Sequence, residues 1–193
     1  MTNALLALSR LIDAVTAFFG RNVKWAILAA ILVSAGNAIL RKAFDLSSNA
    51  WLELQWLLFG AAFMLAAAYT LQWNAHVRID VVSSRLSKRT RDVIELLGHL
   101  FILAPFTLVL LWLSWPYFHE SYVEGEVSSN AGGLPVWPAK LFIFAGFHLL
   151  FLQLVSEVIK RTAILAGRMD DPVAAPVHGH APSDVARGGA HPE

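Results

Sequence analysis

Four long runs of apolar residues constrain the fold of this chain more than any other feature. They lie at about residues 23–39, 52–73, 96–117 and 136–159. A helix needs roughly 20 apolar residues to cross the hydrocarbon layer of a bilayer, which matches the length of these runs. Only 15% of the residues are charged, whereas a soluble domain carries about 25%. The sequence therefore predicts an all-α integral membrane protein with four transmembrane helices, occupying residues 23–165.

The basic residues predict the orientation of these helices. The segment 74–95, between the second and third runs, holds Arg78, Arg85, Lys88, Arg89 and Arg91. On the opposite side of the membrane the connections hold only Arg41, Lys42 and Lys140. Because short loops rich in Lys and Arg remain in the cytoplasm, the segment 74–95 and both termini are predicted to be cytoplasmic.

The segment 74–95 has an amphipathic pattern of its own. Its apolar residues Ile79, Val82, Leu86 and Val93 are spaced by three, four and seven positions. This spacing predicts a helix that lies along the membrane surface. The alternative is an ordinary basic loop between two membrane helices, and both interpretations leave the segment inside the cell.

Residues 1–22 form a second amphipathic segment. Arg10, Asp13 and Thr16 lie opposite an apolar face composed of Leu8, Leu11, Ile12, Val15, Phe18 and Phe19. We expect an interfacial helix that ends at Gly20 as a C-cap, followed by Asn22 as the cap of the next helix. One alternative is a cytoplasmic extension of the first membrane helix. Another is a signal peptide cleaved after Ala35, against which the long amphipathic start argues.

The remaining segments are a predicted periplasmic loop at 118–138 and the tail at 166–193. The loop is acidic and ends at Pro138, near the start of the fourth run, and its Gly132 and Gly133 require defined turns. Within the third run, Pro105 removes a backbone donor and predicts a kink near Phe101. The tail lacks hydrophobic periodicity and is predicted to be disordered and cytoplasmic. Its histidines at 178 and 180 are the residues of an alternative weak metal site.

The membrane helices contain few groups suited to chemistry. Only His148 and Gln153 are expected to lie deep, and a lack of mid-membrane charge argues against an ion or substrate pathway. His99 and His148 would differ in depth by about 12 Å, so they do not match as axial ligands of one haem. We expect no catalytic residue, no cofactor and no metal site.

Several stretches together resemble one family of membrane proteins. They are Arg41 at the end of the first helix, Trp51 and Glu53 at the start of the second, residues 75–80 after it, and Ser128-Ser129 with residues 132–140 before the fourth. They are similar to the small membrane subunit, of the DctQ type, of tripartite ATP-independent periplasmic (TRAP) transporters. The resemblance covers about residues 23–161, and it departs at Asn74-Ala75, where many relatives carry a glycine or a charged residue.

The resemblance implies a location in the bacterial inner membrane and two protein partners. A large permease subunit of the elevator type carries the sodium and substrate sites, and a soluble periplasmic binding protein delivers an organic acid, such as a C4-dicarboxylate or a sugar acid. The small subunit is implied to be an auxiliary scaffold that stabilises the permease and helps to dock the binding protein.

Small residues that recur every four positions allow close helix packing, although alanine abundance in apolar helices gives the same pattern. The predicted interface with the large subunit comprises Ala26, Ala30, Ser34, Asn37, Ala38, Arg41, Ala62, Ala66, Ile79, Val82 and Leu86. The predicted docking residues for the binding protein are Glu120, Glu124, Glu126, Trp137 and Lys140. The alternative for residues 132–140 is a turn that only starts a helix. Two alternatives remain for the whole chain: a membrane anchor of a respiratory oxidoreductase, and a small membrane protein without a transport partner.

Overall fold

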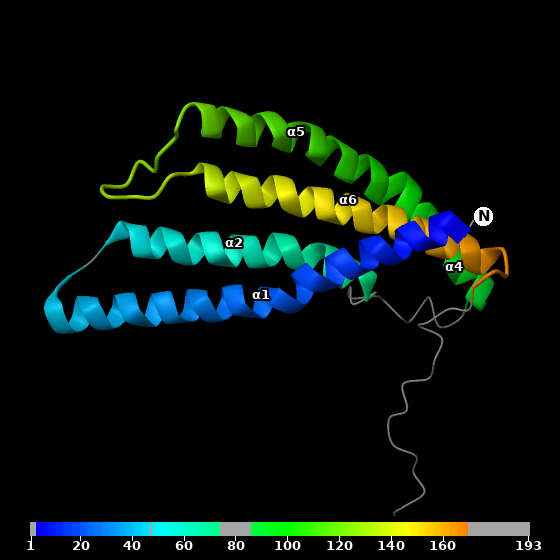
Figure 1. The fold of residues 1–193 in the computed structure, drawn as a ribbon, viewed down its shortest axis with the longest axis horizontal. Helices are drawn as coiled ribbons and strands as arrows, with labels where there is room; N and C mark the ends of the chain where they lie inside the picture. Colours follow the sequence, from blue (N-terminus) through cyan, green and yellow to red (C-terminus); the bar gives the residue numbers. More distant parts are fainter. Residues whose placement is uncertain (1–2, 47, 74–85, 170–193) are drawn as a thin grey trace, which may run out of the picture.

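The computed structural model describes residues 3–46, 48–73 and 86–169, and most of them are helical (Figure 1). Four helical spans are long and apolar enough to cross a membrane: Asn3–Phe44, Asn49–Gln72, Lys88–Val123 and Trp137–Leu165. The prediction of an all-α protein with four transmembrane helices is confirmed. The elements are α1 (Asn3–Phe44), α2 (Asn49–Gln72), α4 (Lys88–Gly98), the π-helical turn η1 (His99–Leu103), α5 (Ala104–Val123) and α6 (Trp137–Leu165).

The four spans lie side by side in the order α1, α2, α6, α5 (Figure 1). The central pair is α2 and α6; α1 packs on both of them, whereas α5 packs mainly on α6. The start of α1, the helix α4 and the end of α6 lie together at one end of the molecule, which we name the termini end. The connection between α1 and α2 and the loop between α5 and α6 lie at the opposite end, which we name the loop end.

Helix α1 corrects the prediction that an interfacial helix ends at Gly20. The helix runs without interruption from Asn3 to Phe44, which is the extension that the sequence left as an alternative. Asn22 does not cap a second helix, because its side chain donates to the carbonyl of Phe18 at 2.7 Å within α1. Glycine costs only about 1 kcal/mol in a helix interior, and Gly20 lies where an added Cβ would overlap the ring of Tyr69 in α2. Gly20 thus serves close helix packing.

The buried face of α1 contains polar residues and its exposed face contains apolar ones, which is the reverse of a helix in a soluble protein. The buried positions Ser9, Thr16, Val23, Ala30 and Asn37 recur every seven residues, a period that keeps one seam of a helix against its neighbours. Apolar residues of the N-terminal half point outward instead, with exposed fractions of 63% for Leu11 and 59% for Phe18. This arrangement suits a lipid environment, because polar groups there must find partners inside the protein.

The span from α4 to α5 starts earlier and ends later than the predicted crossing at 96–117. It begins at Lys88, where the hydroxyl of Ser87 accepts a hydrogen bond from the backbone N–H of Thr90 at 3.2 Å. The kink predicted near Phe101 corresponds to the π turn η1, in which the N–H of Ala104 donates to the carbonyl of His99. Ile79 and Val82, from the predicted surface helix, lie outside the described residues, and Leu86 is half-buried.

Candidate functional site

At the loop end, Glu53 of α2 holds the loop that connects α5 to α6. Its Oε1 accepts hydrogen bonds from the hydroxyl of Ser128 and from Nδ2 of Asn130, the latter at 2.8 Å. Its Oε2 accepts from the backbone N–H of Leu134 at 2.6 Å. About one turn earlier in α2, Asn49 donates to the carbonyl of Ala131 at 3.0 Å. These bonds fix residues 126–136, which we name the outer loop, on the start of α2.

Two glycines allow the outer loop to pack against Glu53. Gly132 has a φ of 68°, a left-handed conformation that favours glycine. A Cβ at Gly133 would come within 2.9 Å of Oε1 of Glu53 and still closer to Ser128. The loop closes through an antiparallel bridge between Val127 and Pro135. The motif at residues 132–138 therefore builds a tight turn against Glu53 before α6 begins at Trp137.

A second set of contacts joins the outer loop to the first turn of α6. Glu126 accepts a hydrogen bond from Nζ of Lys140, and this bond holds the pKa of the Glu126 carboxyl below its ordinary value of 4.5. The Lys140 ammonium also lies 4.2 Å from the ring centroid of Tyr117. Trp137 meets the ring of Tyr122 edge-on at 5.5 Å. Glu126, Trp137 and Lys140, three of the predicted docking residues, therefore have partners within the chain.

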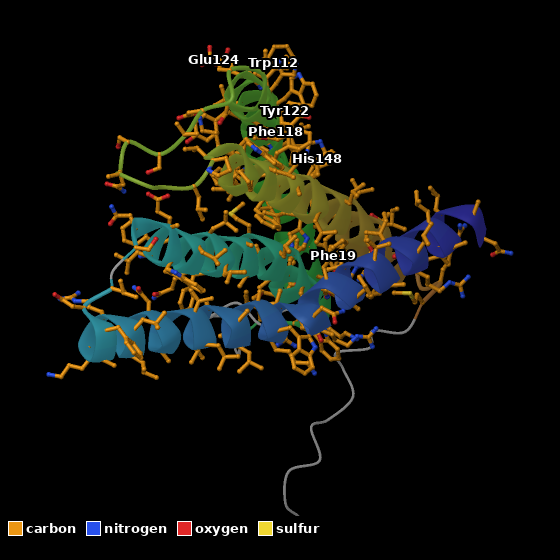
Figure 2. All side chains as sticks on the ribbon, turned by 60° about the vertical axis from the view of Figure 1, so that its left-hand side comes forward. Phe19, Trp112, Phe118, Tyr122, Glu124 and His148 are labelled. Carbon is orange, nitrogen blue, oxygen red and sulfur yellow. The ribbon has the colours of Figure 1, made fainter. Side chains whose placement is uncertain are left out.

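The other two predicted docking residues, Glu120 and Glu124, are exposed near the end of α5. Figure 2 shows Glu124 at the outer tip of this helix, close to Tyr122. Neither carboxylate has an ion pair among the described residues. They form a free acidic surface at the end of α5.

At the termini end, Asp13 of α1 joins α6 through a group of polar side chains. Its Oδ1 accepts from Nε2 of Gln153 at 2.9 Å and from the hydroxyl of Ser156 at 2.7 Å. Its Oδ2 lies 3.1 Å from Nζ of Lys160, which also lies 2.6 Å from Glu157. Asp13, predicted to lie on an interfacial helix, thus reaches the depth of Gln153, and the expectation that only His148 and Gln153 lie deep is incomplete.

A neighbouring ion pair connects α4 to α6. Arg161 lies 2.9 Å from Oδ1 of Asp92 and 2.7 Å from Oε2 of Glu95, and its side chain is only 6% exposed. Neither this group nor the partners of Asp13 were predicted from the sequence. The available signals were the three-residue spacing of Asp92 and Glu95 and the polar face of α1, but neither identifies a partner on another helix.

The predicted interface residues fall into two groups. Ala30, Asn37 and Ala62 are buried within this chain, with exposed fractions of 0%, 8% and 4%. Ala26, Ser34 and Ala66 are half-buried, whereas Ala38 and Arg41 are exposed. The inner positions therefore serve packing within the subunit, and Ala38 and Arg41 retain surface that a partner could contact.

A groove between α5 and α6 carries the most exposed aromatic side chain, Trp112, which is 81% exposed. Figure 2 shows Trp112 projecting outward from α5, with His148 on α6. Nδ1 of His148 lies 2.8 Å from the carbonyl of Phe144. Because a carbonyl only accepts, Nδ1 is the donor in this contact, and Nε2 is the acceptor nitrogen of the Nδ1–H tautomer. The groove, about 700 Å³ in volume, is lined by Leu108, Leu111, Trp112, Trp115, Pro116, Phe144 and His148.

Comparison with known families decides what kind of protein this is. A family model described as tripartite ATP-independent periplasmic transporters, DctQ component, matches residues 30–163. The chain belongs to the DctQ family. Neither the curated proteins nor the solved structures contain a match. This DctQ chain is the small membrane subunit of a TRAP transporter, which works with a large permease subunit and a binding protein, and it is a transport component rather than an enzyme. Family membership decides against the respiratory membrane anchor and against a protein without a transport partner.

Proposed function

We propose that this DctQ chain is a rigid scaffold beside the moving part of a sodium-driven importer of organic acids. The observation that carries the proposal is the internal pairing of its buried and half-buried charges: Asp13 with Lys160, and Arg161 with Asp92 and Glu95. Paired charges cross-link helices, whereas a conduit needs polar groups that exchange partners with its cargo. Substrate and sodium are accordingly bound by the large subunit. The termini end is rich in basic residues and therefore lies on the cytoplasmic side of the bacterial inner membrane.

The large permease subunit is proposed to pack on the α5–α6 groove. Nε2 of His148 lies near the middle of α6, where lipid tails offer no hydrogen-bond donor. A neighbouring protein helix supplies such a donor, and Trp112 adds a wide apolar contact. The exposed positions Ala38 and Arg41 remain a second proposed contact. In this arrangement α2 and α6 form the fixed centre of the subunit.

The binding protein is proposed to dock at the loop end. Glu120 and Glu124 provide its acidic contact, and the bonds from Glu53 to the outer loop keep this end rigid. Glu126, Trp137 and Lys140 support the docking surface through their contacts within the chain. A charged rim of this kind mainly accelerates association and fixes register.

Co-purification with a tagged large subunit tests the scaffold proposal. The variants Trp112→Ala and His148→Ala should reduce recovery of this chain with the permease, and the double variant should reduce it further. The matched control is Phe63→Ala, which removes a 76% exposed aromatic side chain from α2. Equal recovery of all four proteins would place the permease on another face.

Uptake by reconstituted vesicles tests docking and the energy source. Glu120→Lys with Glu124→Lys should raise the concentration of binding protein that gives half-maximal uptake, while uptake at saturating binding protein stays unchanged. Arg10→Glu, an exposed charge reversal at the termini end, is the control. Uptake should stop when sodium is replaced by potassium, and vesicles that contain only this chain should not accumulate substrate. Uptake by this chain alone would overturn the scaffold assignment.

A further inference from the structure

A cavity of about 330 Å³ lies between α2 and α6 beneath the outer loop. Its walls are apolar and include Gly60 and Met64 of α2 and Ile143 of α6, and Leu134 of the loop covers part of it. The cavity falls within the size range of small-molecule sites, roughly 300–1,000 Å³. We name the end of the cavity beside Glu53 its mouth. From Glu53 to Met64, α2 rises about 16 Å. The space is therefore long and narrow, apolar along its length and acidic at one end.

The carboxylate at the mouth has an incomplete set of partners. A carboxylate offers about four acceptor positions, and Glu53 accepts from Ser128, Asn130 and the backbone of Leu134. All three donors are neutral, and no Lys or Arg pairs with Glu53 among the described residues. One acceptor position on Oε2 and one negative charge thus remain for a cation.

The surroundings place the mouth of the cavity at the level of lipid head groups. Trp51 and Trp56 are 43% and 68% exposed on α2, one on each side of Glu53 in the sequence. Exposed tryptophans of membrane helices concentrate at the boundary between head groups and hydrocarbon. An amphiphile at this position would hold its head beside Glu53 and extend its chain towards Met64.

We propose that this cavity binds the alkyl chain of an amphiphile whose ammonium head group pairs with Glu53. The aminoethyl head group of phosphatidylethanolamine has this chemistry, and so does a simple long-chain amine. The apolar walls select an alkyl chain, and the uncompensated carboxylate selects a positive head group over an anionic one. This inference concerns a site within the chain itself and does not depend on the proposed contacts with the permease or the binding protein.

Native mass spectrometry of the full-length chain in a neutral maltoside detergent tests this site. Phosphatidylethanolamine and phosphatidylglycerol with identical acyl chains are titrated separately. We expect phosphatidylethanolamine to half-saturate one site at a concentration about tenfold lower, because a charge-assisted hydrogen bond forms only with the ammonium. Dodecylammonium should displace the lipid, which shows that one chain and one amine suffice. Equal binding of both lipids, or failure of dodecylammonium to compete, would overturn the proposal.

Two glycine variants locate the bound lipid. Gly60 lines the cavity and a Cβ added there meets no neighbour, so the side chain of Gly60→Leu should occupy part of the cavity. Gly36 in α1 also has open space but lies outside the cavity, which makes Gly36→Leu the matched control. Only Gly60→Leu should lose the selective adduct. If Gly60→Leu retained it, the site would be refuted, and the head-group comparison on the unmodified chain remains decisive if that variant failed to fold.

Discussion

Lys160 and Asp13, separated by 147 positions in the sequence, lie with Nζ and Oδ2 only 3.1 Å apart. Their contact joins the first helix to the last at the termini end. Gln72 adds the second helix, because its Nε2 donates to the backbone carbonyl of Asp13 at 3.1 Å. At the loop end, Glu53 and Lys140 attach the outer loop to α2 and α6. Polar bonds thus fasten both ends of a bundle whose middle is apolar.

Removal of the Asp13 carboxylate should loosen the termini end. In Asp13→Ala, Gln153 and Ser156 lose an acceptor and Lys160 keeps only Glu157, so we expect the free energy of unfolding to fall by about 2 kcal/mol, as for other partly buried polar groups that lose a charged partner. Unfolding in mixed micelles, followed by tryptophan fluorescence, measures the change. Arg10→Ala, an exposed charge on the same turn, should have little effect. A similar loss in both variants would contradict the proposed role of Asp13.

Gly20 should tolerate no larger residue. In Gly20→Ala, the new methyl group overlaps the ring of Tyr69, and we expect a destabilisation of roughly 1–3 kcal/mol from overpacking. Gly36→Ala in the same helix meets no neighbour and should stabilise the protein by up to about 1 kcal/mol through helix propensity. Combining Gly20→Ala with Tyr69→Ala should recover part of the loss. If Gly20→Ala and Gly36→Ala behaved alike in the same unfolding assay, the close approach of α1 and α2 would be disproved.

Glu53 should control the mobility of the outer loop. Glu53→Ala leaves Ser128, Asn130 and the N–H of Leu134 without their acceptor, so the loop loses three hydrogen bonds to α2. Hydrogen–deuterium exchange at residues 126–136 should accelerate, whereas exchange at the termini end should not change. Glu124→Ala serves as the control, because Glu124 is exposed at the end of α5. Unchanged protection of the loop in Glu53→Ala would show that other contacts hold it.

The ion pair between Glu126 and Lys140 should make stability depend on pH. Because the hydrogen bond from Lys140 lowers the pKa of Glu126 below 4.5, the contribution is complete above this ordinary value and is lost as pH falls through the lowered pKa. We expect Glu126→Gln to melt at a lower temperature than the unmodified chain near neutral pH. The two melting temperatures should converge in acid. A difference that stays constant over this range would exclude titration of Glu126 as its cause.

Local sequence patterns were sufficient to locate the four membrane spans. Each crossing needs a continuous apolar segment, so length and hydropathy alone located all four helices. Pro105 predicted a kink near Phe101, because proline removes a backbone donor wherever it lies in a helix, and the π turn η1 lies at this position. No kink was predicted at Pro116, and α5 continues through this residue to Val123. The prediction of a helix end at Gly20 was wrong because a glycine that ends a helix and a glycine at a helix crossing cannot be told apart in one sequence.

Only the tertiary structure shows which polar side chains of different helices pair with one another. Asp13, Asp92 and Arg161 are ordinary polar residues in their own helices, and only the packing of α1 and α4 on α6 pairs them. The sequence alone determined that this chain is a four-helix membrane protein with the residue motifs of the DctQ family, because hydrophobicity and turn chemistry are local properties. Only the tertiary structure decided which polar side chains fasten the helices and which faces remain free, because those properties depend on distances between residues far apart in the chain.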